Sequence, residues 1–200
     1  SVCAFLSSIL KANGYKVGMY TSPHLKRFTE RIQINGKEIE EAKLNQLIEK
    51  IKPLYTNQTF FEVTTAAAFQ YFNEENVDIA VLEVGLGGRL DATNVITPLI
   101  SIITHISLDH THVLGKTINQ IAKEKSGIIK ENIPVITLAK NDALKTIKKI
   151  AKQHNSKVFI PKKQSLELGL KGNFQKENAA LAIKAAELLN INKTAIRNGL

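Results

Sequence analysis

The chain has 200 residues, of which 44% are hydrophobic and 22% charged, and its formal net charge is +9. This composition is typical of a globular protein with room for one sizeable core, and no apolar run approaches the roughly 20 residues that span a bilayer. A single cysteine, Cys3, excludes an internal disulfide and indicates a reducing compartment. We expect Cys3 to be buried as an apolar residue and not to act as a nucleophile.

Helices and strands are predicted to alternate along the chain. Apolar residues at helical spacing predict helices at 1–13, 39–55, 60–73, from 117 to about 127, at 142–153, 174–189 and 192–200. Short runs rich in β-branched residues predict strands at 16–20, 31–34, 79–82, 99–103, 134–137 and 157–160. Alternation with short connections predicts an α/β fold, with a mostly parallel sheet flanked by helices on both faces.

The stretch 77–94 is the most informative part of the sequence. The predicted strand 79–82 has the length and composition of a buried parallel strand and ends at a carboxylate, Glu83. A glycine-rich loop follows and carries Arg89, Asp91 and Asn94. Ligands of open α/β sheets bind outside the carboxyl ends of the strands. We therefore favour a functional role for these residues over a helix cap or a loop salt bridge.

Polar residues follow two further predicted strands. Ser22 and His24 come after strand 16–20, and histidines including His110 come after strand 99–103. A hydroxyl, a carboxylate and one imidazole suit Mg²⁺, which prefers oxygen ligands. A zinc site would need more cysteine or histidine ligands, so a pair of His110 and His112 on zinc is the second interpretation.

Lys125 lies on the helix that begins at Thr117, directly after Glu124. Taken by itself, Lys125 most simply belongs to a surface salt bridge, which contributes little to stability.

Six motifs, in this order along the chain, resemble folylpolyglutamate synthase/dihydrofolate synthase, a family within the Mur ligase superfamily. They are Thr21–Leu25, Phe61–Thr65, Gly85–Asn94, Leu108–Thr111 with Leu114-Gly115, Glu124–Lys130 and Asn173–Ala179. Each motif is weak alone, but together they cover essentially the whole chain.

The resemblance implies that residues 1–200 form a P-loop-containing, Mur-ligase-like central ATP-binding domain that is truncated at both ends. Ser1 resembles the last residue of the family's phosphate loop, whose hydroxyl binds Mg²⁺ beside the nucleotide phosphates. The glycines and lysine of that loop and the C-terminal glutamate-binding domain are not in this sequence. We therefore expect these 200 residues alone to be inactive.

The implied activity is that of an ATP-dependent amide ligase. ATP would phosphorylate a carboxylate of the acceptor to an acyl phosphate, which the amine of L-glutamate then attacks. The acceptor would be tetrahydrofolate, which gains further glutamates, or dihydropteroate, and the sequence does not separate the two. The resemblance further implies two Mg²⁺ ions and cytoplasmic folate metabolism.

Residue roles are also implied by the resemblance. Glu83 and His110 match ligands of the second Mg²⁺, with Ser22 nearby in the same site. Lys125 matches a lysine that the family carbamylates, which turns a cation into an anionic oxygen ligand. We therefore assign the catalytic roles to Lys125, His110 and Glu83.

The remaining positions concern the substrates. Phe61, Arg89 and Asp91 resemble the pterin-binding side of the family, and Gln175 and Asn178 match positions that contact the nucleotide base. The chain departs from the family at two places. Ser126 replaces the commoner alanine after the lysine, and Phe174 stands where the family often has histidine before the glutamine.

Two other functions are weighed against this one. A Mur-type ligase acting on a UDP-muramoyl substrate is disfavoured because the loop at 85–94 matches the folate branch. A basic nucleic-acid-binding domain would rest on the net charge alone, and few aromatic residues are interleaved with the basic ones. We expect a monomer with no nucleic-acid or membrane partner.

Overall fold

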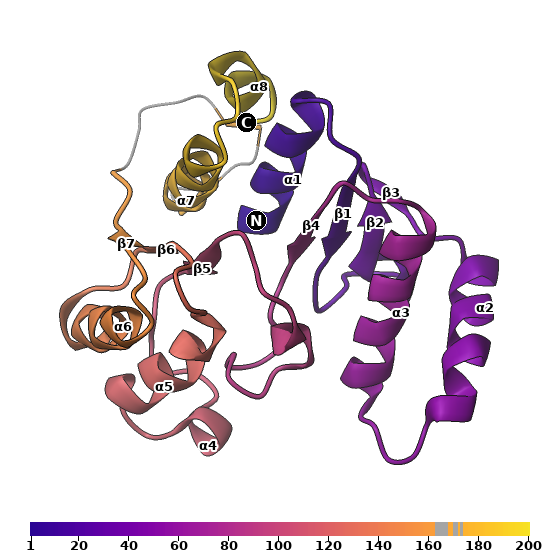
Figure 1. The fold of residues 1–200 in the computed structure, drawn as a ribbon, viewed down its shortest axis with the longest axis horizontal. Coiled ribbons are helices and arrows are strands. Elements are labelled where there is room, and N and C mark those ends of the chain that lie inside the picture. Colours follow the sequence, from indigo (N-terminus) through magenta and orange to yellow (C-terminus); the bar gives the residue numbers. More distant parts are fainter. Residues whose placement is uncertain (163–167, 170–171, 173) are drawn as a thin grey trace. The chain divides into compact units, whose positions relative to one another are not determined.

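The computed structural model describes residues 1–162, 168–169, 172 and 174–200 (Figure 1). The chain divides into two compact units, and each is described by itself. The first unit comprises Cys3–Gly85 and Ile191–Leu200, and the second comprises Ser1–Val2 and Leu86–Asn190.

The first unit contains a four-stranded sheet with the order β3-β2-β1-β4. Its strands are β1 (Val17–Tyr20), β2 (Ile32–Ile34), β3 (Lys37–Glu38) and β4 (Ile79–Leu82). β1 and β4 run parallel, with Tyr20 opposite Leu82, whereas β2 pairs antiparallel with both of its neighbours. Asn35 and Gly36 join β2 to β3 with positive φ angles of 52° and 81°, which is the conformation that a two-residue hairpin requires.

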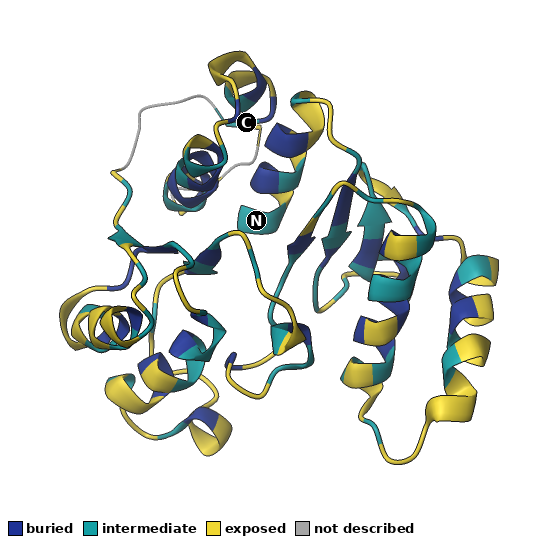
Figure 2. Ribbon diagram, viewed as in Figure 1, coloured by how far each residue is buried: buried dark blue, intermediate teal, exposed yellow. Residues whose placement is uncertain are grey.

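Helices cover this sheet and supply most of the core. The helices of the first unit are α1 (Val2–Ala12, from Cys3 on), α2 (Glu41–Ile51), α3 (Phe60–Glu74) and α8 (Lys193–Asn198), with short 3-10 turns η1 (Phe28–Arg31) and η2 (Lys52–Leu54). The buried residues of α2 lie on the side that faces α3 (Figure 2). Tyr20 is fully buried among Leu47, Ala68 and Phe72, and its hydroxyl lies 3.0 Å from Thr64 Oγ1.

The strand β4 is less buried than its sequence predicts. Only Val81 is buried, Ile79 and Leu82 are half-buried, and Ala80 is exposed. Within the part of the chain that the structure describes, β4 pairs with β1 on one side only, so it forms an edge of the sheet. The prediction of a strand here is confirmed, but the prediction that it is buried is wrong.

The second unit contains a parallel three-stranded sheet with the order β5-β6-β7. The strands are β5 (Ser101–Ile103), β6 (Val135–Thr137) and β7 (Val158–Phe159). The helical segments are α4 (Thr111–Leu114), α5 (Ile118–Lys125), α6 (Asn141–Gln153) and α7 (Gln175–Leu188), with 3-10 turns η3 (Ala92–Val95) and η4 (Ser126–Ile128). The predicted α/β fold with parallel strands is thus confirmed, although the strands form two sheets and the hairpin is antiparallel.

Core packing in the second unit comes mainly from small and branched side chains. Val135 of β6 and Ile147 of α6 have no exposed surface and pack with Ala122 of α5. The helix α5 begins as the sequence predicts, because Thr117 and Gln120 form a reciprocal capping box. In the described residues, no helix has the length and apolar character needed to cross a membrane.

The glycine-rich loop after β4 packs closely against the end of α5. A side chain at Gly88 would come within 3.0 Å of the Lys125 carbonyl oxygen, and one at Gly127 within 2.4 Å of Arg89 Cα and Cβ. The Arg89 N–H donates to the Glu124 carbonyl oxygen at 3.0 Å, and Asn94 Nδ2 donates to the Gly127 carbonyl oxygen at 3.0 Å. The two segments are therefore joined by one hydrogen bond between backbone groups and one from a side-chain amide to a backbone carbonyl.

We predict that Gly127→Ala destabilises the protein by about 1–3 kcal/mol, the usual cost of overpacking a tight site. The added methyl group meets the backbone of Arg89, which has little room to move. Gly85→Ala is the matched control, because its methyl group meets only the Phe61 ring, which is able to tilt. Urea unfolding compares the two variants. A cost for Gly127→Ala no larger than that for Gly85→Ala would contradict the tight packing of this loop.

Glu74 of α3 accepts hydrogen bonds from three donors, two of them on α2 and one, Gln70, on α3 itself. Lys43 Nζ and Lys50 Nζ each lie 2.6 Å from its carboxylate, and Gln70 Nε2 lies at 3.0 Å. The side chain is 21% exposed. The hydrogen bonds from Gln70, Lys43 and Lys50 lower the pKa of Glu74 from 4.5 to about 2.

Because the folded-state pKa of Glu74 is depressed, its stabilising contribution is present above pH 4.5 and is lost as the pH falls toward about 2. Glu74→Gln should therefore lower the free energy of unfolding at neutral pH, and the deficit should shrink at about pH 2. Denaturant titrations at both pH values test this. Glu49→Gln is the control, since Glu49 forms only an exposed pair with Lys52 and should change stability little at either pH. A deficit that does not depend on pH would be evidence against the argument.

Candidate functional site

In the first unit, the ends of two neighbouring parallel strands bring Ser22 and Glu83 together. The Ser22 N–H donates to Glu83 Oε2 at 3.0 Å, and the Glu83 N–H donates to the Tyr20 carbonyl oxygen at 2.8 Å. The Ser22-Pro23 peptide bond is cis. No described residue donates a hydrogen bond to the other oxygen of Glu83, Oε1. One carboxylate oxygen thus remains available for a cation or a ligand.

Phe61 lies beside the start of the glycine-rich loop. Its ring stacks on Tyr20 at 5.7 Å between centroids, and a side chain at Gly85 would come within 2.6 Å of its edge. The half-buried ring thus lies against the backbone at Gly85. The other polar residue predicted at this strand end, His24, accepts a hydrogen bond at Nδ1 from Arg31 Nε at 3.0 Å.

In the second unit, Arg89 is held by Glu124 of α5. Arg89 Nε lies 3.2 Å from both oxygens of the Glu124 carboxylate. Without the resemblance, the sequence favours a surface salt bridge for Lys125, but among the described residues the partner of Glu124 is Arg89 and Lys125 has none. Arg89 reaches Glu124 because the close packing at Gly88 and Gly127 sets the loop directly on the end of α5.

Asp91 organises the loop in addition to any role with a ligand. Its carboxylate accepts hydrogen bonds from the N–H groups of Leu86 and Thr93 at 2.9 and 3.0 Å and from Thr93 Oγ1 at 2.6 Å. Asp91 is thereby the N-cap of η3. The sequence reasoning missed this role, although an aspartate two residues before a threonine is a recognised capping signal.

Lys125, the last residue of α5, is half-buried. Within the described ranges, its amine has no hydrogen bond or ion pair. The next residue, Ser126, is 1% exposed, and its hydroxyl has no partner among the described residues. The end of α5 therefore carries an amine and a hydroxyl that no neighbour of the described chain engages.

His110 precedes α4 with a left-handed backbone, at φ 48°. Its exposed ring is 3.7 Å from the Asp109 carboxylate and 6.3 Å, between centroids, from His112. Among the described residues, no three histidine, cysteine, aspartate or glutamate side chains gather into a metal-binding group. Glu83 and His110 belong to different units, so their joint role as metal ligands stays a prediction.

The predicted nucleotide-side residues lie in the first turn of α7. Asn178 Nδ2 donates to Gln175 Oε1 at 3.0 Å, and Gln175 is buried. Ser1 is exposed at the beginning of the chain. Asn173 of the same sequence motif lies outside the described residues.

Cys3 does not resemble a nucleophile. Burial, followed by the negative charge of Glu83, raises the pKa of its thiol to about 12, so the thiolate is disfavoured near neutral pH. This supports the expectation that Cys3 is not a nucleophile, whereas the expected full burial is not found, because Cys3 is half-buried.

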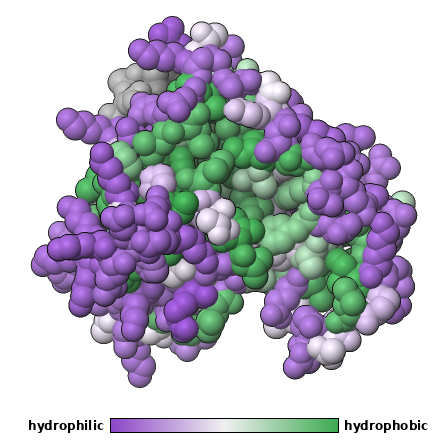
Figure 3. Space-filling view, viewed as in Figure 1, coloured by the Kyte–Doolittle hydropathy of each residue, from purple (hydrophilic) through white to green (hydrophobic). Residues whose placement is uncertain are grey.

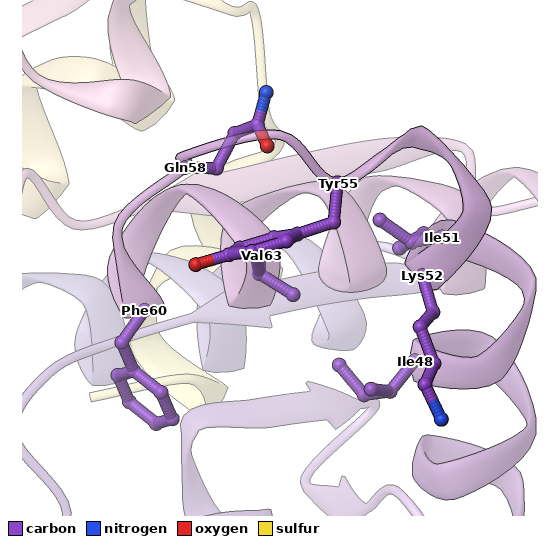
Figure 4. Close-up of a pocket in the computed structure, with 7 residues that line it drawn as sticks. All are labelled: Ile48, Ile51, Lys52, Tyr55, Gln58, Phe60 and Val63. Carbon is purple, nitrogen blue, oxygen red and sulfur yellow. The ribbon is translucent and has the colours of Figure 1, made fainter.

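The first unit also has a shallow apolar pocket that the sequence did not predict (Figure 4). Its volume is about 310 Å³, and it lies where the end of α2 meets the beginning of α3. The Tyr55 ring lies across Val63, and Phe60 closes one side. None of the predicted site residues lines this pocket. Phe61, which is next to Phe60 in sequence, points to the opposite side of α3, toward Tyr20.

The comparisons with known proteins agree on one family. Residues 19–165 match the Mur ligase middle domain. The chain is 39% identical to the dihydrofolate synthase/folylpolyglutamate synthase of Bacillus subtilis, over the whole chain and 56% of that protein.

Solved structures give the same result. The folylpolyglutamate synthase of Thermotoga maritima is 40% identical, with a TM-score of 0.90 over 100% of this chain and 54% of its own. Escherichia coli FolC, solved with DHPP and ADP, is 33% identical, with a TM-score of 0.90 over 99% of this chain and 53% of its own. The chain thus spans about half the length of these relatives, and it belongs to the Mur ligase family, of which it carries the middle domain.

Proposed function

We propose that the protein is an ATP-dependent ligase that joins L-glutamate to a folate, to dihydropteroate, or to both, through an acyl phosphate. The observation that supports this most directly is the match of residues 19–165 to the Mur ligase middle domain, in a chain whose relatives are named folylpolyglutamate and dihydrofolate synthases. The presence of DHPP and ADP in the Escherichia coli relative supports a nucleotide and a pterin-type acceptor as ligands. We further propose that the protein is a cytoplasmic monomer.

The residues at the strand ends fit magnesium. Glu83 keeps one oxygen without a donor among the described residues, and Ser22 is fixed beside it by its own N–H group. Hard oxygen ligands of this kind are the ones that Mg²⁺ prefers. We assign one ion to Glu83, His110 and Ser22 and a second to Ser1. When bound, the ions would supply positive charge where negative charge develops on the transferred phosphoryl group.

Lys125 is proposed to be carbamylated. In this modification the ammonium group first loses a proton to water. The neutral amine then attacks carbon dioxide, an N–C bond forms while one C–O π bond breaks, and a second proton leaves to water, so a cationic side chain becomes anionic. A half-buried lysine without a carboxylate partner among the described residues fits such a role. The product would offer oxygen atoms to a cation or orient a bound phosphate.

The acceptor is proposed to bind along the loop. Asp91 fixes the loop through Leu86 and Thr93, and the Arg89 guanidinium retains donors beyond the one it gives to Glu124. The half-buried Phe61 ring offers an apolar face to a flat pterin. The buried Gln175, oriented by Asn178, offers an amide to the nucleotide base.

The proposed function predicts that the full-length protein releases phosphate from ATP only when an acceptor and L-glutamate are both present. The attacking amine is needed to consume the acyl phosphate, so omitting glutamate should stop turnover. Phosphate release is measured with tetrahydrofolate and dihydropteroate separately, which also ranks the two acceptors. Phosphate release that does not depend on either acceptor would disprove the proposal.

We predict that Lys125→Ala lowers kcat by about 100-fold, the upper end of the range for losing a residue that orients a metal or its ligands. Added short carboxylates such as acetate should restore part of the rate, because they replace the missing anionic oxygens. Lys123→Ala, an exposed lysine on the same helix, is the matched control and should retain wild-type rates. Wild-type rates for Lys125→Ala would identify Lys125 as an ordinary surface residue.

A further inference from the structure

The positive charge of the protein is concentrated in one unit. The second unit has 16 lysines and arginines against 8 aspartates and glutamates, whereas the first has 11 against 10. The second unit therefore carries a net charge of +8 of the total of +9. A general abundance of lysine in the chain would raise the net charge of both units alike, so it does not explain this difference.

Part of this charge forms an ordered row on α6. The exposed lysines Lys145, Lys148, Lys149 and Lys152 follow the spacing i, i+3, i+4 and i+7, which places them on one side of a helix. The opposite side of α6 is buried in the core by Ala143, Ile147 and Ala151. We call the four lysines the α6 basic face. In the view of Figure 3, hydrophilic residues cover this part of the second unit.

The charges of the α6 basic face are largely uncompensated. Lys145 Nζ pairs with Asp142 at 2.9 Å, and both side chains are well exposed. The other three lysines have no ion pair or hydrogen bond within the part of the chain that the structure describes. A row of unpaired like charges repels itself, so an anionic partner would lower its energy.

The position of α6 relates this row to the ligand edge of its own unit. α6 begins shortly after β6 (Val135–Thr137), at the carboxyl ends of the parallel strands, where α/β proteins bind ligands. From there the helix leads the lysines away from that edge. It packs against α5, which ends in Lys125, and Thr146 Oγ1 donates to Asn119 Oδ1 at 3.2 Å.

The residue types on the α6 basic face favour carboxylates as the partner. The face has no arginine, the residue best suited to bidentate binding of phosphate, and no aromatic side chain on which a base would stack. It also has no large apolar residue to enter a membrane, since the apolar side of α6 is buried. Lysines are flexible point charges that suit a chain of separate carboxylates.

We propose that the α6 basic face binds the γ-linked glutamates of an acceptor that already carries several of them. This inference rests on the proposed function, because only a ligase that adds glutamate to folates meets such a polyanionic tail. The glutamates between the pterin and the last residue would loop out along α6, while the pterin stays on the glycine-rich loop and the last carboxylate is at the ligand edge. The face would thus favour long-chain over single-glutamate acceptors without touching the reacting groups.

The test compares KM for a folate with one glutamate and for a folate with a long γ-linked chain, using full-length protein. Replacing Lys148, Lys149 and Lys152 together by Gln should raise KM for the long-chain folate by about tenfold, as expected for three exposed charge pairs. KM for the single-glutamate folate and both kcat values should not change. The matched control replaces Lys11, Lys37 and Lys193, exposed lysines of the first unit, by Gln and removes the same net charge.

The outcomes separate this inference from the proposed function. A specific loss of long-chain preference that higher ionic strength reproduces in the wild type would support the inference. The inference would be overturned if both triple variants lost the preference for the long-chain folate equally, or if neither lost it. It would also be overturned if the basic-face variant lost only the binding of single-stranded DNA. Fluorescence anisotropy measures the binding of free oligo-γ-glutamate to the same variants. If the wild type turns over no folate but binds this peptide through the three lysines, the proposed function fails, whereas the ligand assigned to the α6 basic face stands.

Discussion

The close packing of the glycine-rich loop on the end of α5 is the constraint on which the candidate site of the second unit depends. Gly88 and Gly127 leave no room for a β-carbon, so the loop backbone lies directly against the carbonyl groups of Glu124 and Lys125. The loop is then fixed by hydrogen bonds between backbone atoms and by Asn94. Because backbone contacts do not change with side-chain rotamers, the loop can present polar side chains in one arrangement.

The sequence predicts the strand ends well, because this information is local. The run at 79–82 and the carboxylate after it mark a strand end on their own, and the structure sets Glu83 beside Ser22 through the pairing of β4 with β1. What the sequence does not predict depends on contacts between distant segments. The partner of Glu124 is Arg89, which lies 35 residues away, and no local pattern indicates that pairing. The burial of β4 also depends on neighbours, and an apolar strand at an edge stays partly exposed.

Asp91 in the same loop shows that one carboxylate can have both a structural role and a binding role. Asp91 was predicted as a substrate contact, and the structure gives it three donors within its own loop. A carboxylate has about four lone-pair sites, so these bonds do not exhaust it. These hydrogen bonds fix the orientation of the Asp91 side chain before a ligand binds, so less conformational entropy is lost on binding. A capping role and a binding role are therefore compatible in this residue.

The pairing of Arg89 with Glu124 bears directly on Lys125. Glu124 and Lys125 are adjacent on α5, and adjacent side chains of a helix do not face each other. Arg89 Nε lies 3.2 Å from both oxygens of Glu124, so this carboxylate is paired with a side chain that is always cationic. The loop contact that places Arg89 thus takes up the carboxylate next in sequence to Lys125, and the amine of Lys125 has no partner among the described residues. The proposed carbamylation of Lys125 draws on this arrangement.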